Sequence, residues 1–517
     1  MVVYALAWAL LLVNRGLYWD DYVLAGQPPG ELVRMFTELG LPWGSIAYIA
    51  IFATPFPGWL AHVLAFGAYL AATLLFHAIL RRAPGLTPTD ALVGGLVFAV
   101  LPVNVARIAV IDLMYGLSLL AFLAATWLLL EHIERPRRWK RVASLVLFVA
   151  SFYTASLLVL YAVPILLGFW ILRRAGRGDL PGVVGRYADF LLLPVGYWIV
   201  KALAFRSSGP YEGYNAISAA GLTDVPRRFV SVPWQVVGEP LARAIDVAGP
   251  IGIVAGVVAA AWLVWRGRGL GAATESVGAG GSAFQVPGVV LGIAGVAILA
   301  LGVFPYLAVG RVPAIWDWSS RHQLLVPIGV AVIAAAVARG VGGLGAAGRR
   351  VGLVVVGLGL GISVVADVRT LLDYQLDWFK QEALVDAVRA TPEAAAAHHV
   401  RIDDRATALN ALRRTYRFYE YGALFEEAIG GTARLVANAD GEPAPKSLPL
   451  VVERPRYRLT GYQPAPVDLT LQIVPRDRAG GLTALRLLAL EATDSATYHA
   501  ELARLIELRP AAAGAVP

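Results

Sequence analysis

Residues 142–172 decide the topology of the chain, and they read VASLVLFVASFYTASLLVLYAVPILLGFWIL. The stretch contains no charged residue. At about 1.5 Å per residue it is too long for one upright helix across a hydrocarbon layer about 30 Å thick, and it is short for two helices. A hairpin that turns near Phe152, Tyr153 and Thr154 places the basic loops of the chain on a single side of the membrane. One continuous helix would scatter them over both sides, against the positive-inside rule.

The basic loops that decide between hairpin and helix are spread over most of the chain. They contain Arg81 and Arg82; Arg135, Arg137, Arg138, Lys140 and Arg141; Arg173, Arg174, Arg177 and Arg186; Arg266 and Arg268; and Arg339, Arg349 and Arg350. With the hairpin, the sequence predicts an α-helical polytopic membrane protein with about eleven spanning helices. The predicted spans are 1–17, 58–80, 90–104, 109–130, 142–153, 156–172, 187–205, 246–265, 286–306, 322–338 and 351–367.

This topology fixes the expected location of both ends. The first apolar run lacks a small-residue cleavage site, so it is interpreted as an anchor rather than a signal peptide. The N-terminus is expected in the cytoplasm and the segment after the last span outside, for an integral protein of the plasma or inner membrane. The same alternation places four further segments outside: 14–57, 104–108, 201–245 and 307–321.

Composition supports a membrane domain followed by a water-soluble domain. Of the 517 residues 58% are hydrophobic and 15% are charged, whereas soluble proteins average roughly 25% charged. Of the 80 charged residues, 35 lie in 374–517. We therefore expect a transmembrane domain over 1–373 and a small mixed α/β extracytoplasmic domain over 374–517.

The C-terminal domain shows four local patterns. It is expected to contain a helix over 382–390, strands over 399–402 and 467–474, and a closing amphipathic helix over 495–508. None of its residues is predicted to be catalytic. Acceptor recognition, a lid and a purely structural cap are the roles that this domain leaves open.

Charge and cysteine content exclude several function classes. The net charge of +8 follows from the cytoplasmic loops, so no nucleic-acid partner is expected. The chain has no Cys, which excludes disulfides and thiolate metal sites. No cofactor and no metal ligand set is predicted, although a metal requirement stays open.

Polar residues of unusual type gather in the outside segments, first after the first span. Asp20 and Asp21 are adjacent carboxylates near the membrane interface, where burial raises the pKa and suits a general base. The alternative is that Asp20 caps a helix and Asp21 is solvated. The neighbouring aromatic residues, predicted to contact substrate, are Tyr18, Trp19 and Tyr22. Residues 30–39 are expected to form a helix along the interface, and 42–57 to lead into the second span.

A third carboxylate, Asp112, falls inside an apolar helix near its outer end. An ionisable residue inside a membrane is a functional hypothesis by default. The alternative is a structural ion pair with Arg107, which is otherwise assigned to substrate binding. Tyr211, in the long outside segment 201–245, is assigned to the same group.

The loop before the tenth span is the second concentration of polar residues. Arg311 and Arg321 offer forked donors that suit a phosphate, and His322 is grouped with them, with an ordinary hydrogen-bonding role as its alternative. Trp316 and Trp318 offer faces for a sugar ring. Interfacial anchoring is the alternative for the whole loop.

With these residues the chain resembles the C-type membrane glycosyltransferases (GT-C), which include the protein O-mannosyltransferases and bacterial transferases that use polyprenyl-phosphate sugars. The resemblance covers roughly residues 14–205, with a weaker likeness at 305–325. It rests on Asp20 and Asp21, on Pro57-Gly58-Trp59-Leu60-Ala61-His62, on Leu101-Pro102-Val103 leading to Asp112, and on Phe152-Tyr153-Thr154-Ala155-Ser156 with Pro164. The chain departs from the family pattern at Leu41, where a basic residue is frequent, and at Leu101, where His is.

The resemblance implies transfer of a sugar from a polyprenyl-phosphate donor to a hydroxyl of a glycan, lipid or protein at the outer face. An Asp of the first outside loop would be the base or a carboxylate that orients the acceptor, and 201–245 would help to form the site. A transporter or flippase for a lipid-linked or small solute is the main alternative, and a non-catalytic scaffold is the third.

Overall fold

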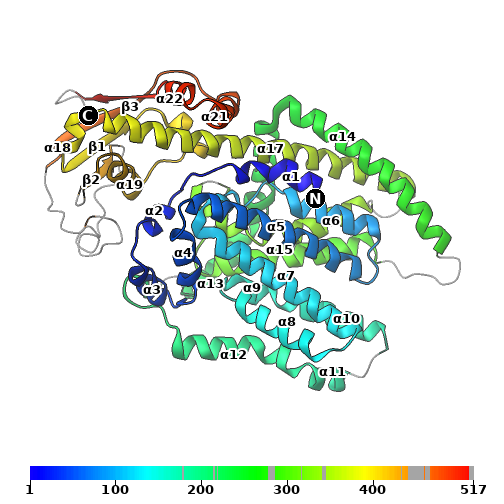
Figure 1. The fold of residues 1–517 in the computed structure, drawn as a ribbon. Helices are drawn as coiled ribbons and strands as arrows, with labels where there is room; N and C mark the ends of the chain where they lie inside the picture. The colour runs from blue at the N-terminus through cyan, green and yellow to red at the C-terminus, as the bar shows by residue number, and fades with distance from the viewer. Residues whose placement is uncertain are drawn as a thin grey trace.

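The computed structural model describes residues 1–176, 180–213, 216–217, 219–277, 286–315, 317–339, 345–431, 434–439, 459 and 466–511. The chain is a helical membrane protein with a small mixed sheet near its C-terminus (Figure 1).

The helices of the N-terminal half are α1 (Val2–Trp8), α2 (Asp21–Leu24), α3 (Pro29–Glu38), α4 (Gly44–Phe52), α5 (Pro57–Arg82), α6 (Pro88–Val100), α7 (Leu113–Glu134), α8 (Arg138–Ser151), α9 (Ser156–Leu160), α10 (Ala162–Arg174), α11 (Leu180–Arg186) and α12 (Ala188–Ala204). Those of the C-terminal half are α13 (Ala219–Pro233), α14 (Glu239–Val277), α15 (Gly288–Ala308), α16 (Val326–Ala338), α17 (Gly345–Arg389), α18 (Pro392–Ala396), α19 (Phe418–Ile429), α21 (Gly481–Thr493) and α22 (Ser495–Leu502). The strands are β1 (His399–Asp404), β2 (Leu435–Asn438), β3 (Leu469–Pro475) and β4 (Ile506–Pro510). Short 3-10 turns that matter below are η2 (Val105–Ile108), η3 (Val110–Asp112), η4 (Gly209–Tyr211) and η6 (Asp317–Gln323).

Among the described residues, six helical segments are long and apolar enough to cross a membrane. They are Pro57–Arg82, Val110–Glu134, Ser156–Arg174, Leu222–Gly267, Gly288–Ala308 and Gly345–Arg389, and three shorter apolar helices cover Val2–Leu12, Pro88–Val100 and Val326–Ala338. Each of the eleven predicted spans overlaps a helix of the structure. The count of eleven crossings stays a prediction.

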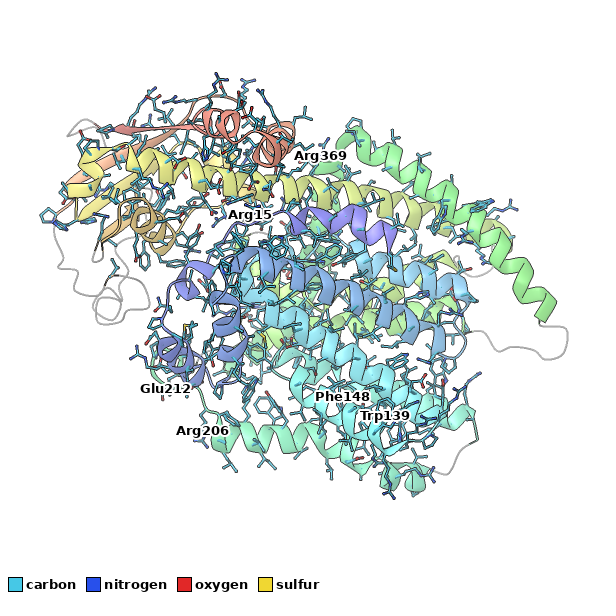
Figure 2. All side chains as sticks on the ribbon, in the orientation of Figure 1. Arg15, Trp139, Phe148, Arg206, Glu212 and Arg369 are labelled. Atoms are coloured by element: carbon cyan, nitrogen blue, oxygen red, sulfur yellow. The ribbon has the colours of Figure 1, made fainter. Side chains whose placement is uncertain are left out.

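The hairpin predicted within residues 142–172 is present. Helix α8 ends at Ser151 and α9 begins at Ser156. The rings of Phe148 and Tyr161 are 4.8 Å apart, although thirteen residues of continuous helix would separate them by about 20 Å. Phe148, labelled in Figure 2, is fully buried, whereas Trp139 at the other end of α8 is 57% exposed. The chain therefore folds back on itself at residues 152–155.

Glycines allow α14 and α17 to pack backbone against backbone. A methyl group on Gly357 would lie 2.3 Å from the Cα of Ala260, and one on Gly361 would lie 2.3 Å from the carbonyl carbon of Ala255. Small residues at such contacts let membrane helices approach closely. This pair forms the upper layer of the helical bundle in Figure 1.

The sheet at the C-terminus has the strand order β2-β1-β3-β4. Strand β1 runs parallel to β2 and β3, and β4 pairs antiparallel with β3. The strands predicted at 399–402 and 467–474 are confirmed. The closing helix predicted over 495–508 is wrong in its second half, because α22 ends at Leu502 and Ile506–Pro510 forms strand β4. Strand β4 pairs with β3, and without it the backbone groups along that edge of β3 would have no hydrogen-bond partners.

Helix α17 connects the two parts of the molecule. It continues without a break through the expected boundary at 373/374. Its first half packs against α14 and α16, while Phe379, Leu384 and Val388 contribute to the core beneath the sheet. The C-terminal unit therefore includes the end of a membrane helix.

Candidate active site

Asp21 is a structural anchor of residues 14–57, which we call the first loop. Its carboxylate is fully buried and accepts hydrogen bonds from the backbone N–H groups of Tyr18 (2.9 Å), Val110 (2.9 Å) and Ile111 (2.8 Å). Burial raises the pKa of Asp21 to about 7, and the three N–H donors act in the opposite direction. Because both oxygens are occupied, Asp21 ties the first loop to the segment just before Asp112. The alternative in which Asp21 is solvated is wrong.

Asp20 lies beside it in a different environment. Its side chain is half-buried, and Oδ1 accepts a hydrogen bond of 2.8 Å from the hydroxyl of Tyr419 in α19. Asp20 precedes α2, but its side chain makes no capping hydrogen bond, so the capping alternative is wrong. Of the two adjacent carboxylates, Asp20 is therefore the more exposed.

Asp112 is the least compensated acidic group of this region. It lies at the junction of η3 and α7, is 2% exposed, and within the described chain neither carboxylate oxygen has a hydrogen-bond partner. The charges of Arg321, Asp21 and Asp20 act on it. A buried polar group without a partner is costly, so such a group in a native protein calls for a functional explanation.

Arg107 does not pair with Asp112, so that alternative is wrong. Its guanidinium lies 3.8 Å from the ring centroid of Trp8 and 4.7 Å from that of Tyr69. It also donates to the carbonyl oxygens of Asn104 (3.1 Å) and Val103 (3.0 Å). Arg107 thus stabilises the turn between α6 and α7 and faces aromatic rings rather than an open site.

The loop around η6 meets the first loop. The Arg321 guanidinium lies 4.3 Å from the ring centroid of Trp318, and the rings of Trp318 and Trp19 are 5.5 Å apart. Arg321 is partly buried and its charge acts on Asp112, whereas Arg311 is exposed and donates its backbone N–H to the carbonyl of Tyr306. Trp316 lies outside the described residues.

Tyrosines that the sequence did not single out surround Asp112. The Tyr48 hydroxyl donates to the carbonyl of Ile111, Tyr306 shares a hydrogen bond of 3.1 Å with Ser156, and the Asp112 charge acts on both rings. His322 packs 5.0 Å from Tyr306, and its buried Nδ1 has no partner in the described structure.

Three of the aromatic residues predicted to contact substrate, Tyr18, Trp19 and Tyr22, are buried in an internal contact. The Tyr18 hydroxyl donates to the carbonyl of Tyr374 (2.7 Å), and the Tyr22 hydroxyl donates to Gln381 (2.6 Å). Trp19 is 2% exposed and donates its backbone N–H to Glu420 (3.1 Å). These side chains hold the C-terminal domain against the first loop.

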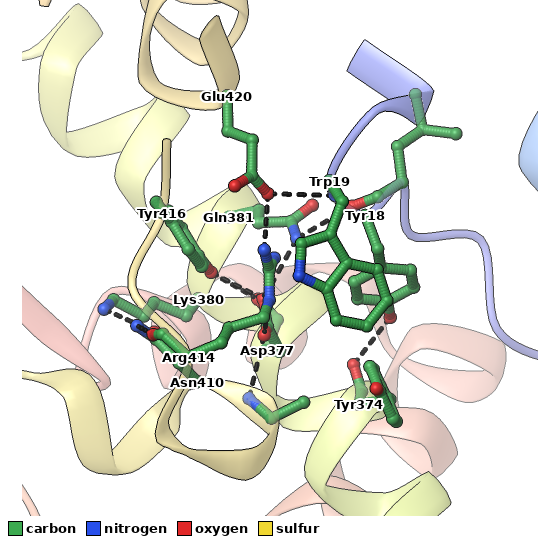
Figure 3. Close-up of polar contacts among 12 residues, drawn as sticks. Tyr18, Trp19, Tyr374, Asp377, Lys380, Gln381, Asn410, Arg414, Tyr416 and Glu420 are labelled. Carbon is green, nitrogen blue, oxygen red and sulfur yellow. Dashed lines mark hydrogen bonds and ion pairs between the residues drawn. The ribbon is translucent and has the colours of Figure 1, made fainter. Parts of the chain in front are cut away.

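A buried charge network completes this contact (Figure 3). Asp377 in α17 accepts hydrogen bonds from Arg414 Nε (2.8 Å) and from the Tyr416 hydroxyl (2.6 Å), and Arg414 also pairs with Glu420. Lys380 forms a second buried pair with Asp404 at 2.6 Å. Burial raises the pKa of Glu420, and the Arg414 guanidinium opposes that effect.

The available sequence signal for this network was the run TYRFYEYG at 415–422, which places three tyrosines and Glu420 within one short stretch. Tyr211 is the remaining predicted residue. It is half-buried in η4, which joins α3 through a hydrogen bond of 2.8 Å from Ser208 N to the Glu38 carbonyl. Arg206 and Glu212 flank this contact in Figure 2.

The described residues contain no group of three His, Asp or Glu side chains that could hold a metal ion. No protein-family model and no curated protein sequence matches this chain. A buried carboxylate without a hydrogen-bond partner, Asp112, lies in electrostatic range of the partly buried Arg321 and of the half-buried Asp20. Such a set can accept a proton and bind an anionic group.

Proposed function

We propose that the chain is a GT-C-like glycosyltransferase that moves a sugar from a polyprenyl-phosphate donor to a hydroxyl acceptor at the outer face of the membrane. The observation that carries the proposal is the uncompensated Asp112 within electrostatic range of Arg321 and Asp20. A buried carboxylate next to a cation and a second carboxylate suits a site where charge is redistributed during reaction. The resemblance in residues 14–205 supports the same chemistry.

The proposed step is a displacement at the anomeric carbon. Asp20 takes the proton of the acceptor hydroxyl, and the acceptor oxygen forms a bond to the anomeric carbon. The bond from that carbon to the phosphate oxygen breaks, and the electron pair leaves with the polyprenyl phosphate. Arg321 stabilises the charge of the leaving phosphate, as forked cationic donors do. Asp112 is buried, so it acts on the site through its charge rather than through contact with the sugar.

Substitutions at two carboxylates test the proposal. Asp20→Asn and Asp112→Asn keep the shape of each side chain and remove its charge, and Asp477→Asn, at an exposed surface position, is the matched control. Membranes that contain each variant are given a panel of synthetic polyprenyl-phosphate hexoses and pentoses, and release of polyprenyl phosphate is measured. We expect the first two variants to lose release and the control to retain it. Unchanged release in both carboxylate variants would remove the proposal.

The proposal includes the topology: an N-terminus in the cytoplasm and a C-terminal domain outside. The distribution of basic loops supports it. Since the chain has no Cys, single cysteines at Arg81 and Asp477 can be labelled in intact cells with a membrane-impermeant maleimide. Labelling at Asp477 and protection at Arg81 are expected, and the reverse pattern would overturn this orientation.

One observation favours the alternative of a transporter or flippase. Asp367 lies inside the apolar part of α17, is 1% exposed, and has no hydrogen-bond partner within the described structure. Ionisable residues within membrane segments often mark a transport path. Purified protein in liposomes decides between the two: movement of polyprenyl-phosphate sugar across the bilayer without release of polyprenyl phosphate would favour transport.

A further inference from the structure

We propose that the C-terminal domain completes the active site through Tyr419, which acts as a positioning residue for Asp20. The catalytic meaning of this inference rests on the function proposed above. It assigns the domain a role different from acceptor recognition, a lid or a structural cap.

The geometry begins with a direct contact between residues 399 positions apart. Tyr419 lies in the first turn of α19, and its hydroxyl donates to Oδ1 of Asp20 at 2.8 Å. Its ring packs on the apolar cluster that α2 and α3 form with α4, so the side chain is held on both sides. Burial, with the charge of Asp20, raises the pKa of Tyr419 well above its ordinary value. The hydroxyl therefore keeps its proton and remains a donor at physiological pH.

The next residue holds the backbone beside Asp20. Glu420 accepts the backbone N–H of Trp19 at 3.1 Å. Trp19 has φ of +51°, in the left-handed region that a bulky residue rarely adopts. Such a conformation persists only where the surrounding structure holds it. Two successive residues of α19 therefore bind two successive residues of the first loop. Tyr419 binds the side chain of Asp20, and Glu420 binds the backbone N–H of Trp19.

A comparison with Asp21 shows why this contact concerns Asp20 in particular. The three donors to Asp21 are backbone N–H groups of the membrane domain, at Tyr18, Val110 and Ile111. Asp20, by contrast, receives its hydrogen bond from the C-terminal domain. The orientation of the accessible carboxylate is therefore set by a domain that follows the last membrane helix. Docking of that domain and activity of the site are then linked.

Tyr419→Phe tests the inference, and Tyr421→Phe is its matched control. Both changes remove one hydroxyl from α19, but Tyr421 donates to Asp404 at 3.1 Å, away from Asp20. A hydrogen bond to a charged group typically supports a tenfold or larger effect, so Tyr419→Phe is expected to lower kcat about tenfold with the donor KM unchanged. Tyr421→Phe leaves Asp404 paired with Lys380 at 2.6 Å and removes no contact to Asp20, so both constants are expected to stay close to those of the wild type.

A second readout does not depend on catalysis. Water-soluble carbodiimide modifies carboxyl groups, and modification of Asp20 can be followed by mass spectrometry at one fixed pH. Because the Tyr419 hydroxyl occupies Oδ1 of Asp20, Tyr419→Phe should increase the extent of labelling at Asp20, and Tyr421→Phe should not.

The outcomes separate the two proposals. If Tyr419→Phe behaves like Tyr421→Phe in both the labelling and the kinetic measurements, Tyr419 does not position Asp20, while the transferase proposal stands. If Asp20→Asn releases polyprenyl phosphate at the wild-type rate, the proposed role of Asp20 fails, and with it the catalytic meaning of Tyr419, whatever the labelling shows.

Discussion

Replacement of Arg414 by Met should detach the C-terminal domain from the first loop. Methionine has a similar reach but no charge. In the wild type, Arg414 is fully buried and neutralises Asp377 and Glu420, with its Nε 2.8 Å from Asp377 Oδ2. The variant leaves two buried carboxylates without their cation.

The expected size of the effect follows from that burial. Breaking a buried ion pair by removing one partner costs about 3–5 kcal/mol. At about 1.4 kcal/mol for each factor of ten, the population in which this contact is open should rise by about two to three and a half orders of magnitude. The exposed pair of Arg509 and Glu507, at 2.7 Å, provides the control, because surface pairs contribute only about 0–1 kcal/mol.

Limited proteolysis of the purified full chain in detergent can measure the open population. When opening is fast relative to cleavage, the rate of cleavage follows that population. Cleavage within residues 410–420, identified by mass spectrometry, should be at least about a hundredfold faster in Arg414→Met than in Arg509→Met. Equal cleavage rates in the two variants would refute the view that this network holds the domain in place.

Three further outcomes are expected. Burial raises the pKa of Asp21 from 3.8 to about 7, so the folded state binds this proton more tightly than the unfolded state does. The melting temperature of the wild type, relative to that of Asp21→Asn, should therefore fall as the pH rises from about 4 to 7. A difference that does not change with pH would contradict this. Arg321→Ala should reduce release of polyprenyl phosphate by about a hundredfold or more. Arg311 is exposed, so Arg311→Ala should change release by less than about threefold. Similar losses in both variants would show that Arg321 has no specific role in binding the phosphate. Tyr161→Ala should lower the free energy of unfolding by about 3–5 kcal/mol, because it removes the ring that packs on Phe148 in the hairpin. Leu166 is 65% exposed, so Leu166→Ala should have almost no effect in thermal denaturation. A small effect of Tyr161→Ala would argue against this packing.

Local patterns predicted much of the fold. The charge-free run 142–172, with basic residues on both sides, predicts the hairpin, since membrane insertion depends on local apolar length and flanking charge. The strand at 469–475 follows from strict alternation. Strand β4 was not predicted, because its extended conformation depends on pairing with β3. That pairing has no local signature in the sequence.

The candidate site was predictable in type but not in detail. Asp20 and Asp21 are adjacent residues of the same type, so the sequence alone does not distinguish their roles. In the structure Asp21 is buried and surrounded by backbone donors, whereas Asp20 is half-buried. The same limit applies to Tyr419, whose contact with Asp20 spans most of the chain. Contacts of such separation depend on how the domains dock, which neither periodicity nor composition encodes.

Helix α17 adds a mechanical property to the molecule. It has 45 residues, so it is about 68 Å long if straight, with one end among the membrane helices and the other beneath the sheet. A rotation of 5° about its membrane end would displace the far end by about 6 Å, twice the length of a hydrogen bond. Helix tilt changes with bilayer thickness. Any change in the tilt of α17 relative to the first loop would therefore shift Asp377 against the loop that carries Asp20.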